Sequence, residues 1–349
     1  MAKKLYKQWT IQSQTGVDGL RLSSTELPDL LNDHDILVKI HAASLNYRDL
    51  VLIRGDLSLA TSPNVVPGSD GAGTVISIGK SVTSFSINDK VVTHLVPRIA
   101  SSRFPGPVHI MSGLGQVHHG TLREYGVFHE ETLIRMPNNL SFEEAATLTC
   151  SGLTAWNALV GDRGVESLRG KTVLTQGTGG VSVAALQFAH AAGATVIATT
   201  SSDSKAARLM ALGATHTINY RASPEWGGIT REVSAKSEGV STIVDIGGRS
   251  TLSESFKAVM VGGTISLTGA LGTAGEEKPD IMDVLWKACS LRGIWLGTKD
   301  QFNDLVAFIE EKDVKPVVDQ RVFRLEDLKD ALVYLEDQRH FSKVVIKIV

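Results

Sequence analysis

Residues 172–200 combine a strand, a glycine-rich turn, an apolar helix and a second strand in immediate succession. The strands are predicted at 172–176 and 195–199, and the helix runs over about 181–192 and ends at Gly193. A chain that leaves a strand through a helix and returns to a strand places the two strands parallel in one sheet. This unit therefore predicts a parallel sheet covered by helices in the middle of the chain.

Four more strand patterns follow at 216–219, 242–245, 264–268 and 291–295, each near a glycine turn. Helical patterns, such as the one over 205–212, separate most of them. Six strands that alternate with helices at this spacing predict a doubly wound parallel sheet, so the predicted fold class is α/β.

The turn after the first of these strands follows the pattern G-x-G-x-x-G, with a small serine in the last place: Gly177, Thr178, Gly179, Gly180, Val181 and Ser182. Gly177 permits the sharp turn, and Gly179 lets the backbone approach a diphosphate, whose charge then meets the N-terminus of the helix. A strand before the pattern and a helix after it are the context that makes the pattern specific. It predicts a bound dinucleotide; the alternative is a glycine turn that binds nothing.

The end of the second strand indicates which dinucleotide is bound. NAD enzymes place an acid there to hold the ribose 2′-hydroxyl, whereas this strand ends at Thr200. The Ser201 hydroxyl and Lys205 suit a 2′-phosphate, which an acid would repel. We therefore predict NADP(H). The alternative is a solvated Lys205, and an inward-pointing Asp203 would weaken the prediction, although a helix-capping aspartate points at backbone amides instead.

The first third of the chain has shorter strand patterns with Gly and Pro between them, at 36–40, 71–78, 89–92 and 124–128. Such patterns predict an irregular antiparallel β domain. Residues 97–120 contain three prolines, four glycines and three histidines, which predicts a long loop.

Helical patterns occupy much of the rest. Ser141 and Glu144 form a capping box that starts a helix, which continues to residue 160 and is expected to break near 151–152. The tail contains two helices and a closing strand, at 302–311, 325–337 and 343–348. Because that strand lies beyond a six-stranded sheet, we expect it to return to the N-terminal β domain.

Composition excludes several classes of protein. The 35 basic and 37 acidic residues give a net charge of −2, which argues against nucleic-acid or acidic-membrane binding. Two cysteines rule out a disulfide scaffold and a four-cysteine zinc lobe. The first residues have no signal-peptide pattern, and the most apolar stretch, 181–199, is interrupted by polar residues. We expect a cytoplasmic protein with no membrane partner.

Motifs along nearly the whole chain resemble the medium-chain dehydrogenase/reductase superfamily, in its zinc-free, quinone-oxidoreductase-like and enoyl-reductase-like branches. Besides the phosphate loop, the motifs are PGSDGAGTV at 67–75, NDKV at 88–91, GLTA at 152–155 and FSKVV at 341–345. The resemblance implies a GroES-like catalytic domain and a Rossmann domain that binds the cofactor. Their expected bounds are 1–129 with 299–349 for the first and 130–298 for the second.

The zinc ligands of the superfamily are largely missing. Where zinc members have C-x-x-D and G-H-E, this chain has Asn46 and Ser69 in place of the cysteine and the histidine, and only Cys150 fits the third ligand position. One thiolate among polar neighbours cannot hold a closed zinc site, so we predict no metal. The histidines of the long loop lack ligand spacing and are predicted to be exposed: His109, His118 and His119.

Loss of zinc shifts the expected chemistry. Reduction of an isolated carbonyl needs a strong electrophile, whereas hydride addition to a C=C conjugated to a carbonyl gives a delocalised enolate that hydrogen-bond donors can stabilise. Residues 46–49 (NYRD) resemble the N-[YF]-[RK]-D segment of enoyl-thioester reductases. The resemblance implies an NADPH-dependent reductase of an enone, enal, quinone or enoyl thioester.

The same resemblance suggests roles within this segment. Tyr47 is the candidate donor of a proton or of a hydrogen bond to the oxyanion; the alternatives are a packing tyrosine and a proton from water. Asn46 is expected to contact the substrate or the nicotinamide ribose. Asp49 is either a helix cap or catalytic. Arg48 is expected to pair with Asp49 or Asp70.

Further cofactor contacts are implied by the resemblance. Thr154 would lie beside the nicotinamide, Tyr220 would flank the adenosine phosphate and Lys343 would contact the cofactor; their alternatives are ordinary packing or surface positions. Room for the dinucleotide is expected at three strand-end glycines, Gly247, Gly269 and Gly297. Cys150 has the alternative of a small buried apolar residue.

Three other readings of function stay open. A zinc-free carbonyl reductase or alcohol dehydrogenase is the nearest, and an NADPH-binding sensor or scaffold without turnover is a different class. A third is an enoyl reductase that acts on an acyl-carrier partner, which the sequence cannot reveal. The expected partners are a small-molecule substrate and a second copy of the chain in a homodimer.

Overall fold

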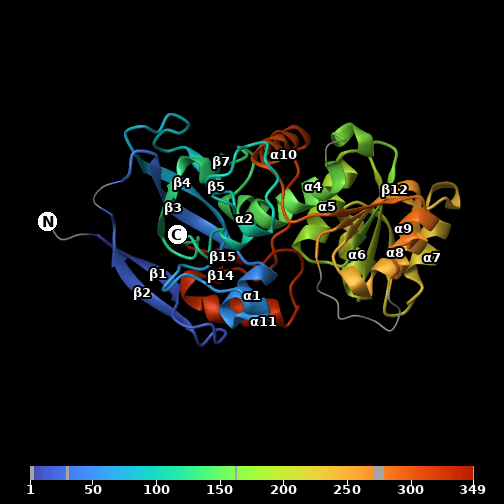
Figure 1. The fold of residues 1–349 in the computed structure, drawn as a ribbon, viewed down its shortest axis with the longest axis horizontal. Coiled ribbons are helices and arrows are strands. Elements are labelled where there is room, and N and C mark those ends of the chain that lie inside the picture. The colour runs from blue at the N-terminus through green and yellow to red at the C-terminus, as the bar shows by residue number, and fades with distance from the viewer. Residues whose placement is uncertain (1–3, 29–30, 162, 270–278, 349) are drawn as a thin grey trace. The chain divides into compact units, whose positions relative to one another are not determined.

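The computed structural model describes residues 4–28, 31–161, 163–269 and 279–348. The chain divides into two compact units, one formed by residues 1–153 with 298–349 and the other by residues 154–297 (Figure 1). The expected boundary lay at 129/130, but residues 130–153 pack with the first unit. The reason is that β7 (Leu133–Arg135) pairs with β5 (Lys90–Thr93), and α3 (Phe142–Ala145) packs on the sheet of that unit.

The unit of residues 154–297 contains a six-stranded sheet in the order β10-β9-β8-β11-β12-β13, with every neighbouring pair parallel. This order reverses between β8 and β11 and confirms the predicted doubly wound fold. The strands are β8 (Thr172–Gln176), β9 (Thr195–Thr200), β10 (Ala214–Asn219), β11 (Val240–Asp245), β12 (Val259–Leu267) and β13 (Ser290–Gly293).

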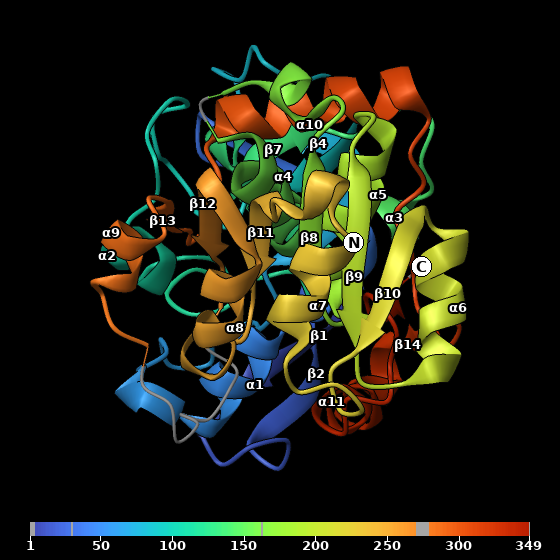
Figure 2. The same cartoon turned by 90° about the vertical axis from the view of Figure 1, so that its right-hand side faces the viewer.

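Helices connect these strands and cover the sheet. α5 and α6 contact β8, β9 and β10, while α7 and α8 lie together on the face turned to the viewer in Figure 2. Fully buried aliphatic side chains of β8, β9, β11 and β12 fill the interior: Leu174, Ile197, Ile243 and Ile265. The helices are α4 (Leu153–Val160), α5 (Gly180–Ala191), α6 (Asp203–Ala211), α7 (Trp226–Val233), α8 (Leu252–Ala258) and α9 (Asp283–Trp286).

The other unit is built on a mixed sheet in the order β14-β15-β3-β4-β5-β7, with β6 also paired to β3. The closing strand β15 pairs antiparallel with β3, as expected for a tail that returns to the N-terminal domain. A separate hairpin joins β1 and β2. The remaining strands are β1 (Leu5–Ile11), β2 (Leu20–Glu26), β3 (Asp35–Ser44), β4 (Asp70–Ile78), β6 (Tyr125–His129), β14 (Phe323–Arg324) and β15 (Val345–Lys347).

Helices of this unit begin where capping residues occur. Ser141 Oγ accepts a hydrogen bond from Glu144 N at 3.2 Å, which is the predicted capping box. The expected break near residues 151–152 is a π-helical turn, Leu148–Gly152. α1 was not expected from the sequence. The predicted 97–120 loop contains one short helix, α2. The α-helices besides α3 are α1 (Tyr47–Arg54), α2 (Pro107–Met111), α10 (Lys299–Lys312) and α11 (Leu328–Glu336).

Strand register brings three segments that are distant in sequence together where β3 ends. Ser44, at the end of β3, lies opposite Asp70 on one side and Val345 on the other. α1 begins three residues after Ser44, and Lys343 lies two residues before β15.

Among the described helices, none has both the length and the apolar character needed to cross a membrane.

Candidate functional site

A buried carboxylate, Asp70, lies at the centre of a polar cluster in the first unit. It has no exposed surface, and its Oδ1 accepts a hydrogen bond from Ser69 Oγ at 2.7 Å. Its Oδ2 accepts from Ser44 Oγ at 3.1 Å and from the backbone N of Cys150 at 3.4 Å. A buried carboxylate needs such donors because removing its charge from water is costly.

A lysine completes this cluster. Lys343 is 4 % exposed, and its Nζ donates to Leu45 O at 2.7 Å and to Asn46 Oδ1 at 2.5 Å. The same Nζ lies 3.5 Å from Asp70 Oδ2. An ammonium has three hydrogens, and these three acceptors use all of them. Lys343 is therefore not a surface lysine, and in this arrangement it has no hydrogen left for the cofactor contact that the resemblance implied.

Asn46 and Asp49 cap the first turn of α1. Asn46 is the N-cap residue, and its backbone N donates to Asp49 Oδ2 at 2.8 Å. Asp49 is thus a helix cap, and burial raises its pKa to about 6. Two buried polar atoms at this position have no protein partner: Asn46 Nδ2 and Asp49 Oδ1. Unpartnered buried atoms of this kind are uncommon and mark a position where a ligand can supply the missing partner.

Tyr47 and Arg48 follow in the first turn of α1. The Tyr47 side chain is 47 % exposed and so is not a core packing residue. Arg48 does not pair with Asp49 or Asp70 as expected. Its guanidinium donates to the carbonyl oxygens of Leu114 and Ile110 at 3.0 and 3.2 Å, and to Gln116 Oε1 at 3.0 Å. Arg48 therefore fastens the second half of the 97–120 loop to α1.

The positions of the family's zinc ligands do gather around Asp70, but their chemistry does not suit zinc. Ser69 Oγ donates to Asp70, and Asn46 Oδ1 accepts from Lys343. Burial raises the pKa of the Cys150 thiol to about 12, so in this cluster the side chain is a neutral thiol. The Lys343 ammonium would also repel a divalent cation. Within the described part of the chain, no three His, Cys, Asp or Glu side chains form a group able to hold a metal.

The loop histidines serve the local backbone. His109 Nδ1 accepts from Gly106 N at 3.1 Å at the start of α2, and His119 Nδ1 accepts from Val66 N at 3.0 Å. His118 and His119 are exposed, and His109 is half-buried. The exposure of His118 and His119 agrees with the prediction, whereas His109 is less exposed than expected.

The phosphate loop has the geometry that a diphosphate requires. Gly177 has a φ of +81°, which glycine adopts without strain, and Ser182 Oγ donates to Gln176 O at 2.6 Å to tie α5 to β8. Gly179 has an ordinary φ of −79°, and a Cβ added there would meet no atom within 4 Å. No described residue requires a glycine at 179, and the open space beside it, at the N-terminus of α5, is a candidate position for a diphosphate.

The end of β9 presents hydroxyl groups instead of an acid. Thr200 is buried, and Ser202 is the N-cap of α6. Asp203 is exposed, and its Oδ1 accepts from Asn219 Nδ2 at 2.8 Å, so this carboxylate is turned toward β10. Ser201 and Lys205 are half-buried beside it. Tyr220, just after β10, is 39 % exposed, and its backbone N donates to Thr200 O at 3.0 Å.

At two other predicted cofactor positions, Gly247 and Gly269, the surrounding protein leaves no space for a side chain. A Cβ at Gly247 would lie 2.5 Å from Thr251 Cγ2, and a Cβ at Gly269 would lie 2.6 Å from Ile246 O. Both glycines are therefore required by the protein's own packing, whatever else they do. Thr154, in α4, and Gly297 are buried, and Thr178, Gly180 and Val181 are half-buried in the phosphate loop.

Sequence reasoning missed a second buried carboxylate, Asp245, at the end of β11. Its oxygens accept from Gly248 N, Thr251 Oγ1, Gln176 Nε2 and Ser255 Oγ. An aspartate that ends an apolar strand pattern just before paired glycines was the available signal. This cluster fixes the turn after β11 to the neighbouring strand β8.

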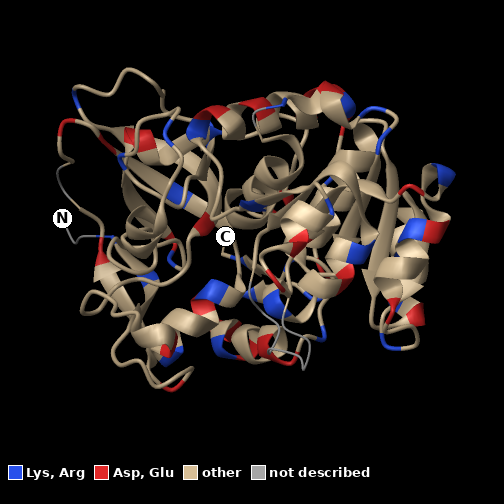
Figure 3. Ribbon diagram, turned by 45° about the vertical axis from the view of Figure 1, so that its right-hand side comes forward, with Lys and Arg blue, Asp and Glu red and all other residues tan. Residues whose placement is uncertain are grey.

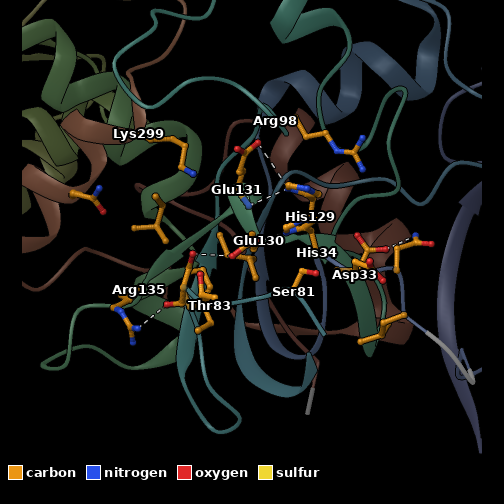
Figure 4. Close-up of a pocket in the computed structure, with 18 residues that line it drawn as sticks. Asp33, His34, Ser81, Thr83, Arg98, His129, Glu130, Glu131, Arg135 and Lys299 are labelled. Carbon is orange, nitrogen blue, oxygen red and sulfur yellow. Dashed lines mark hydrogen bonds and ion pairs between the residues drawn. The ribbon is translucent and has the colours of Figure 1, made fainter. Parts of the chain in front are cut away.

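A polar groove of the first unit is lined by residues of which none is a predicted site residue. His34, Glu130, Glu131, Arg98 and Lys299 are among the residues that line it (Figure 4). Glu130 is already hydrogen-bonded to His34 at 2.7 Å and to Ser84 at 2.8 Å. Figure 3 shows that basic and acidic residues are interspersed along the described chain.

Family models match both units. The alcohol dehydrogenase GroES-like domain matches residues 32–138, and the zinc-binding dehydrogenase model matches residues 180–311. The second match begins at Gly180, after β8 and the first three residues of the phosphate loop, and covers α5 and the strands from β9 to β13. The residues of the Asp70 cluster differ from a zinc site as described above.

Full-length relatives match as well. A zinc-type alcohol dehydrogenase-like protein of Schizosaccharomyces pombe is 41 % identical, with 96 % of each chain covered. A 2-methylene-furan-3-one reductase of Solanum lycopersicum is 31 % identical over 97 % of this chain and 78 % of that protein. The crystal structure of a putative alcohol dehydrogenase from Sinorhizobium meliloti 1021 superimposes with a TM-score of 0.90, at 36 % identity, over 99 % of this chain and 100 % of that one.

Proposed function

Because the chain belongs to the medium-chain dehydrogenase/reductase superfamily, in its quinone-oxidoreductase-like branch, we propose that it reduces the C=C of an α,β-unsaturated carbonyl with NADPH. That the chain is an oxidoreductase follows from the family. The direction, the cofactor and the substrate class proposed here rest on the residues of the two sites.

The observation that carries the proposal is the lysine-centred cluster at the position of the family's catalytic metal. The Lys343 ammonium lies against Asp70 Oδ2 and Asn46 Oδ1, the oxygens of two side chains at this position, so these residues do not form a zinc ligand set. Without a Lewis acid, the site is suited to a reaction whose developing charge is spread over an enolate. The Solanum lycopersicum relative is named for a substrate with a methylene group beside a ketone, which belongs to this class.

A bound nicotinamide supplies the hydride in this reaction. Tyr47, exposed at the start of α1, is the proposed donor of the proton to the α-carbon, and Asn46 is the proposed contact to the carbonyl oxygen. The substrate is a small enone, enal, quinone or enoyl thioester. Metal analysis of the purified protein is expected to find far less than one zinc per chain.

NADPH is the proposed form of the cofactor. β9 ends in Thr200 with Ser201 and Lys205 after it, and Asp203 is held by Asn219. A 2′-phosphate therefore meets hydroxyl groups and a cation rather than a free carboxylate. The proposed contacts are Thr154, Gly177, Thr178, Gly179, Gly180, Val181, Ser201, Lys205, Tyr220, Gly247, Gly269 and Gly297. Comparison of kcat/KM with NADPH and NADH tests this, and a preference for NADH would contradict it.

Turnover of an enone by Tyr47→Phe tests the assignment of the proton donor. We expect kcat to fall about 100-fold while the dissociation constant for NADPH stays unchanged, because only the hydroxyl is lost. Tyr334→Phe is the matched control, since it removes a hydroxyl from a half-buried tyrosine that bonds Asp319 and is not among the proposed site residues. Unchanged turnover by Tyr47→Phe would mean that water donates the proton.

A panel of enones, quinones, enals and ketones separates this proposal from its nearest rivals. A zinc-free carbonyl reductase would oxidise NADPH with ketones and leave the C=C of enones intact. A sensor or scaffold would bind NADPH but would not oxidise it in the presence of any acceptor of the panel. We place no acyl-carrier partner on any described surface, and the cytoplasmic location stays a prediction.

We also propose that the chain forms a homodimer through the β13 edge of the parallel sheet. β13 is the outer strand on that side, and apolar side chains nearby are exposed, with Trp286 at 74 %, Ile281 at 71 % and Leu285 at 61 %. An open strand edge beside exposed apolar residues favours pairing with a second copy. Leu285→Glu is expected to convert a dimer into a monomer in light-scattering measurements; a wild-type monomer would contradict the proposal.

A further inference from the structure

We infer that Lys343 is a positioning residue that takes the part of the missing metal by orienting and polarising the amide of Asn46 toward the substrate's carbonyl oxygen. The inference rests on the proposed enone reduction and extends it to a residue outside the NYRD segment. It assigns the Lys343 ammonium to the substrate end of the site rather than to the cofactor.

The orientation of the Asn46 amide follows from the lysine. A primary amide has an acceptor oxygen and a donor nitrogen of similar shape, so its neighbours decide which way it points. The Lys343 ammonium has only hydrogens to offer and lies 2.5 Å from Asn46 Oδ1. The amide nitrogen must therefore point away from the lysine.

That nitrogen is left without a protein acceptor in buried surroundings. Asn46 is 8 % exposed, and its Nδ2 has no hydrogen-bond partner. A buried donor without an acceptor destabilises the folded state, so the arrangement has no structural benefit of its own. A substrate oxygen placed against Nδ2 would supply the missing acceptor.

The lysine also strengthens this donor. An ammonium on the oxygen of an amide draws electron density from the nitrogen, and hydrogen bonds in such a chain reinforce one another in a buried site. Asp70 keeps the charge of Lys343 balanced, and it is itself held by Ser69 and Ser44. The cluster thus delivers positive potential through one fixed N–H group.

In the reaction, hydride adds to the β-carbon and the C=C electron pair moves into the Cα–carbonyl bond. The carbonyl π pair moves onto oxygen, where Asn46 Nδ2 stabilises the negative charge. The Tyr47 hydroxyl then gives its proton to the α-carbon, the C=O re-forms, and water returns a proton to the phenolate. The alkene is reduced, NADPH is oxidised to NADP⁺, and Lys343 exchanges no proton with the substrate.

The test compares Lys343→Met with Lys347→Met, which removes an exposed lysine of β15 that lies four residues away. With cyclohex-2-enone as the probe, we expect Lys343→Met to lower kcat about 10- to 100-fold, as for loss of an oxyanion donor. NADPH affinity, measured by protein fluorescence, should change less than about twofold, because the lysine does not contact the cofactor. Lys347→Met should match the wild type, and Lys343→Arg should recover part of the rate.

Infrared spectroscopy gives a readout that does not depend on turnover. In the presence of NADP⁺, the carbonyl stretch of bound cyclohex-2-enone should lie below its frequency in water for the wild type and Lys347→Met. The shift should shrink in Lys343→Met and in Asn46→Ala, because both weaken the same donor. If Lys343→Met leaves Asp70 unbalanced and fails to fold, Lys343→Met/Asp70→Asn removes both charges together and takes its place.

The outcomes separate this inference from the proposed function. An active wild type with an equally active Lys343→Met and an unchanged carbonyl stretch would overturn the inference and leave enone reduction standing. A large loss of NADPH affinity in Lys343→Met would also overturn it and assign the lysine to the cofactor. A wild type that never turns over enones would overturn the proposed function, and the absence of a carbonyl shift in that protein would overturn the inference as well.

Discussion

Two buried aspartates, one in each unit, solve the same physical problem in different ways. Asp245 ends β11 and accepts four hydrogen bonds, from Gly248 N, Thr251 Oγ1, Gln176 Nε2 and Ser255 Oγ, over 2.6–3.1 Å. Asp70 begins β4 and is balanced by a charged partner, Lys343, in addition to two hydroxyls and an amide. Both side chains are fully buried.

The difference lies in what remains unpaired nearby. Around Asp245 every carboxylate oxygen has two donors of the protein's own, so the cluster acts as a structural fastener. Beside Asp70, two atoms are left without partners, Asn46 Nδ2 and Asp49 Oδ1. A cluster that the protein completes by itself stabilises the fold, whereas one that it leaves incomplete is available to a ligand.

The strongest test of the comparison is Asp245→Ala. This change removes the shared acceptor of four donors and leaves Gly248 N and Ser255 Oγ without a second acceptor in the described part of the chain, and we expect it to lower the free energy of unfolding by about 3 to 5 kcal/mol. Urea denaturation followed by circular dichroism measures the loss. Asp203→Ala, which removes an exposed aspartate of the same unit, should change stability by less than about 1 kcal/mol. If Asp245→Ala also lowered the free energy of unfolding by less than about 1 kcal/mol, the Asp245 cluster would not be the structural element that the comparison with the Asp70 cluster requires.

The second test uses pH at the incomplete cluster. Burial raises the pKa of Asp49 from 3.8 to about 6, so the folded state holds this proton more tightly than the unfolded state does. The stabilisation is complete below about pH 4 and is lost as pH rises toward 6, in total about 3 kcal/mol.

Asp49→Asn removes this titration while keeping a side-chain oxygen that accepts the hydrogen bond from the backbone N–H of Asn46. The free energy of unfolding of the wild type relative to Asp49→Asn should therefore fall between pH 4 and pH 7. Urea denaturation at each pH measures the difference. A pH-independent difference would show that Asp49 titrates in the folded protein as it does in water.

The smallest effects concern two glycines of the parallel-sheet unit. Gly247→Ala places a Cβ 2.5 Å from Thr251 Cγ2, and we expect a loss of about 1 to 3 kcal/mol in stability. Gly179→Ala meets no atom within 4 Å, so its stability should change by less than about 1 kcal/mol. NADPH affinity should instead fall about tenfold, because the methyl group occupies the proposed diphosphate position. Titration calorimetry that shows unchanged affinity would remove Gly179 from the proposed site.

Much of the fold could be predicted from local pattern. The parallel sheet and its phosphate loop follow from apolar strands, glycine turns and helices in regular alternation, and each predicted strand lies within the observed one or overlaps it. α1 was missed because it is short and its first turn, with Asn46 and Asp49, resembles a loop in sequence. β12 begins at Val259, five residues earlier than expected, because Gly262 and Gly263 interrupt its apolar residues and resemble a turn in sequence.

The candidate site was predicted unevenly for a related reason. Asn46 and Tyr47 could be found because they stand in one short motif, and the loss of zinc ligands could be read position by position. Arg48 was assigned the wrong partners, since its guanidinium bonds carbonyl groups more than 60 residues away. Backbone acceptors leave no mark in a sequence, so such a contact cannot be inferred from residue types.

The sequence by itself determined the α/β architecture, the glycine-rich turn between β8 and α5 and the absence of a zinc ligand set, because each depends on neighbouring residues or on residue identity. Only the tertiary structure decided that Lys343 lies against Asn46, 297 positions away, and that it is fully engaged there. The pairing arises because β15 adds to the edge of β3, a choice made by strand register and burial across the whole unit. Contacts of that range are fixed when the core packs, and no local pattern encodes them.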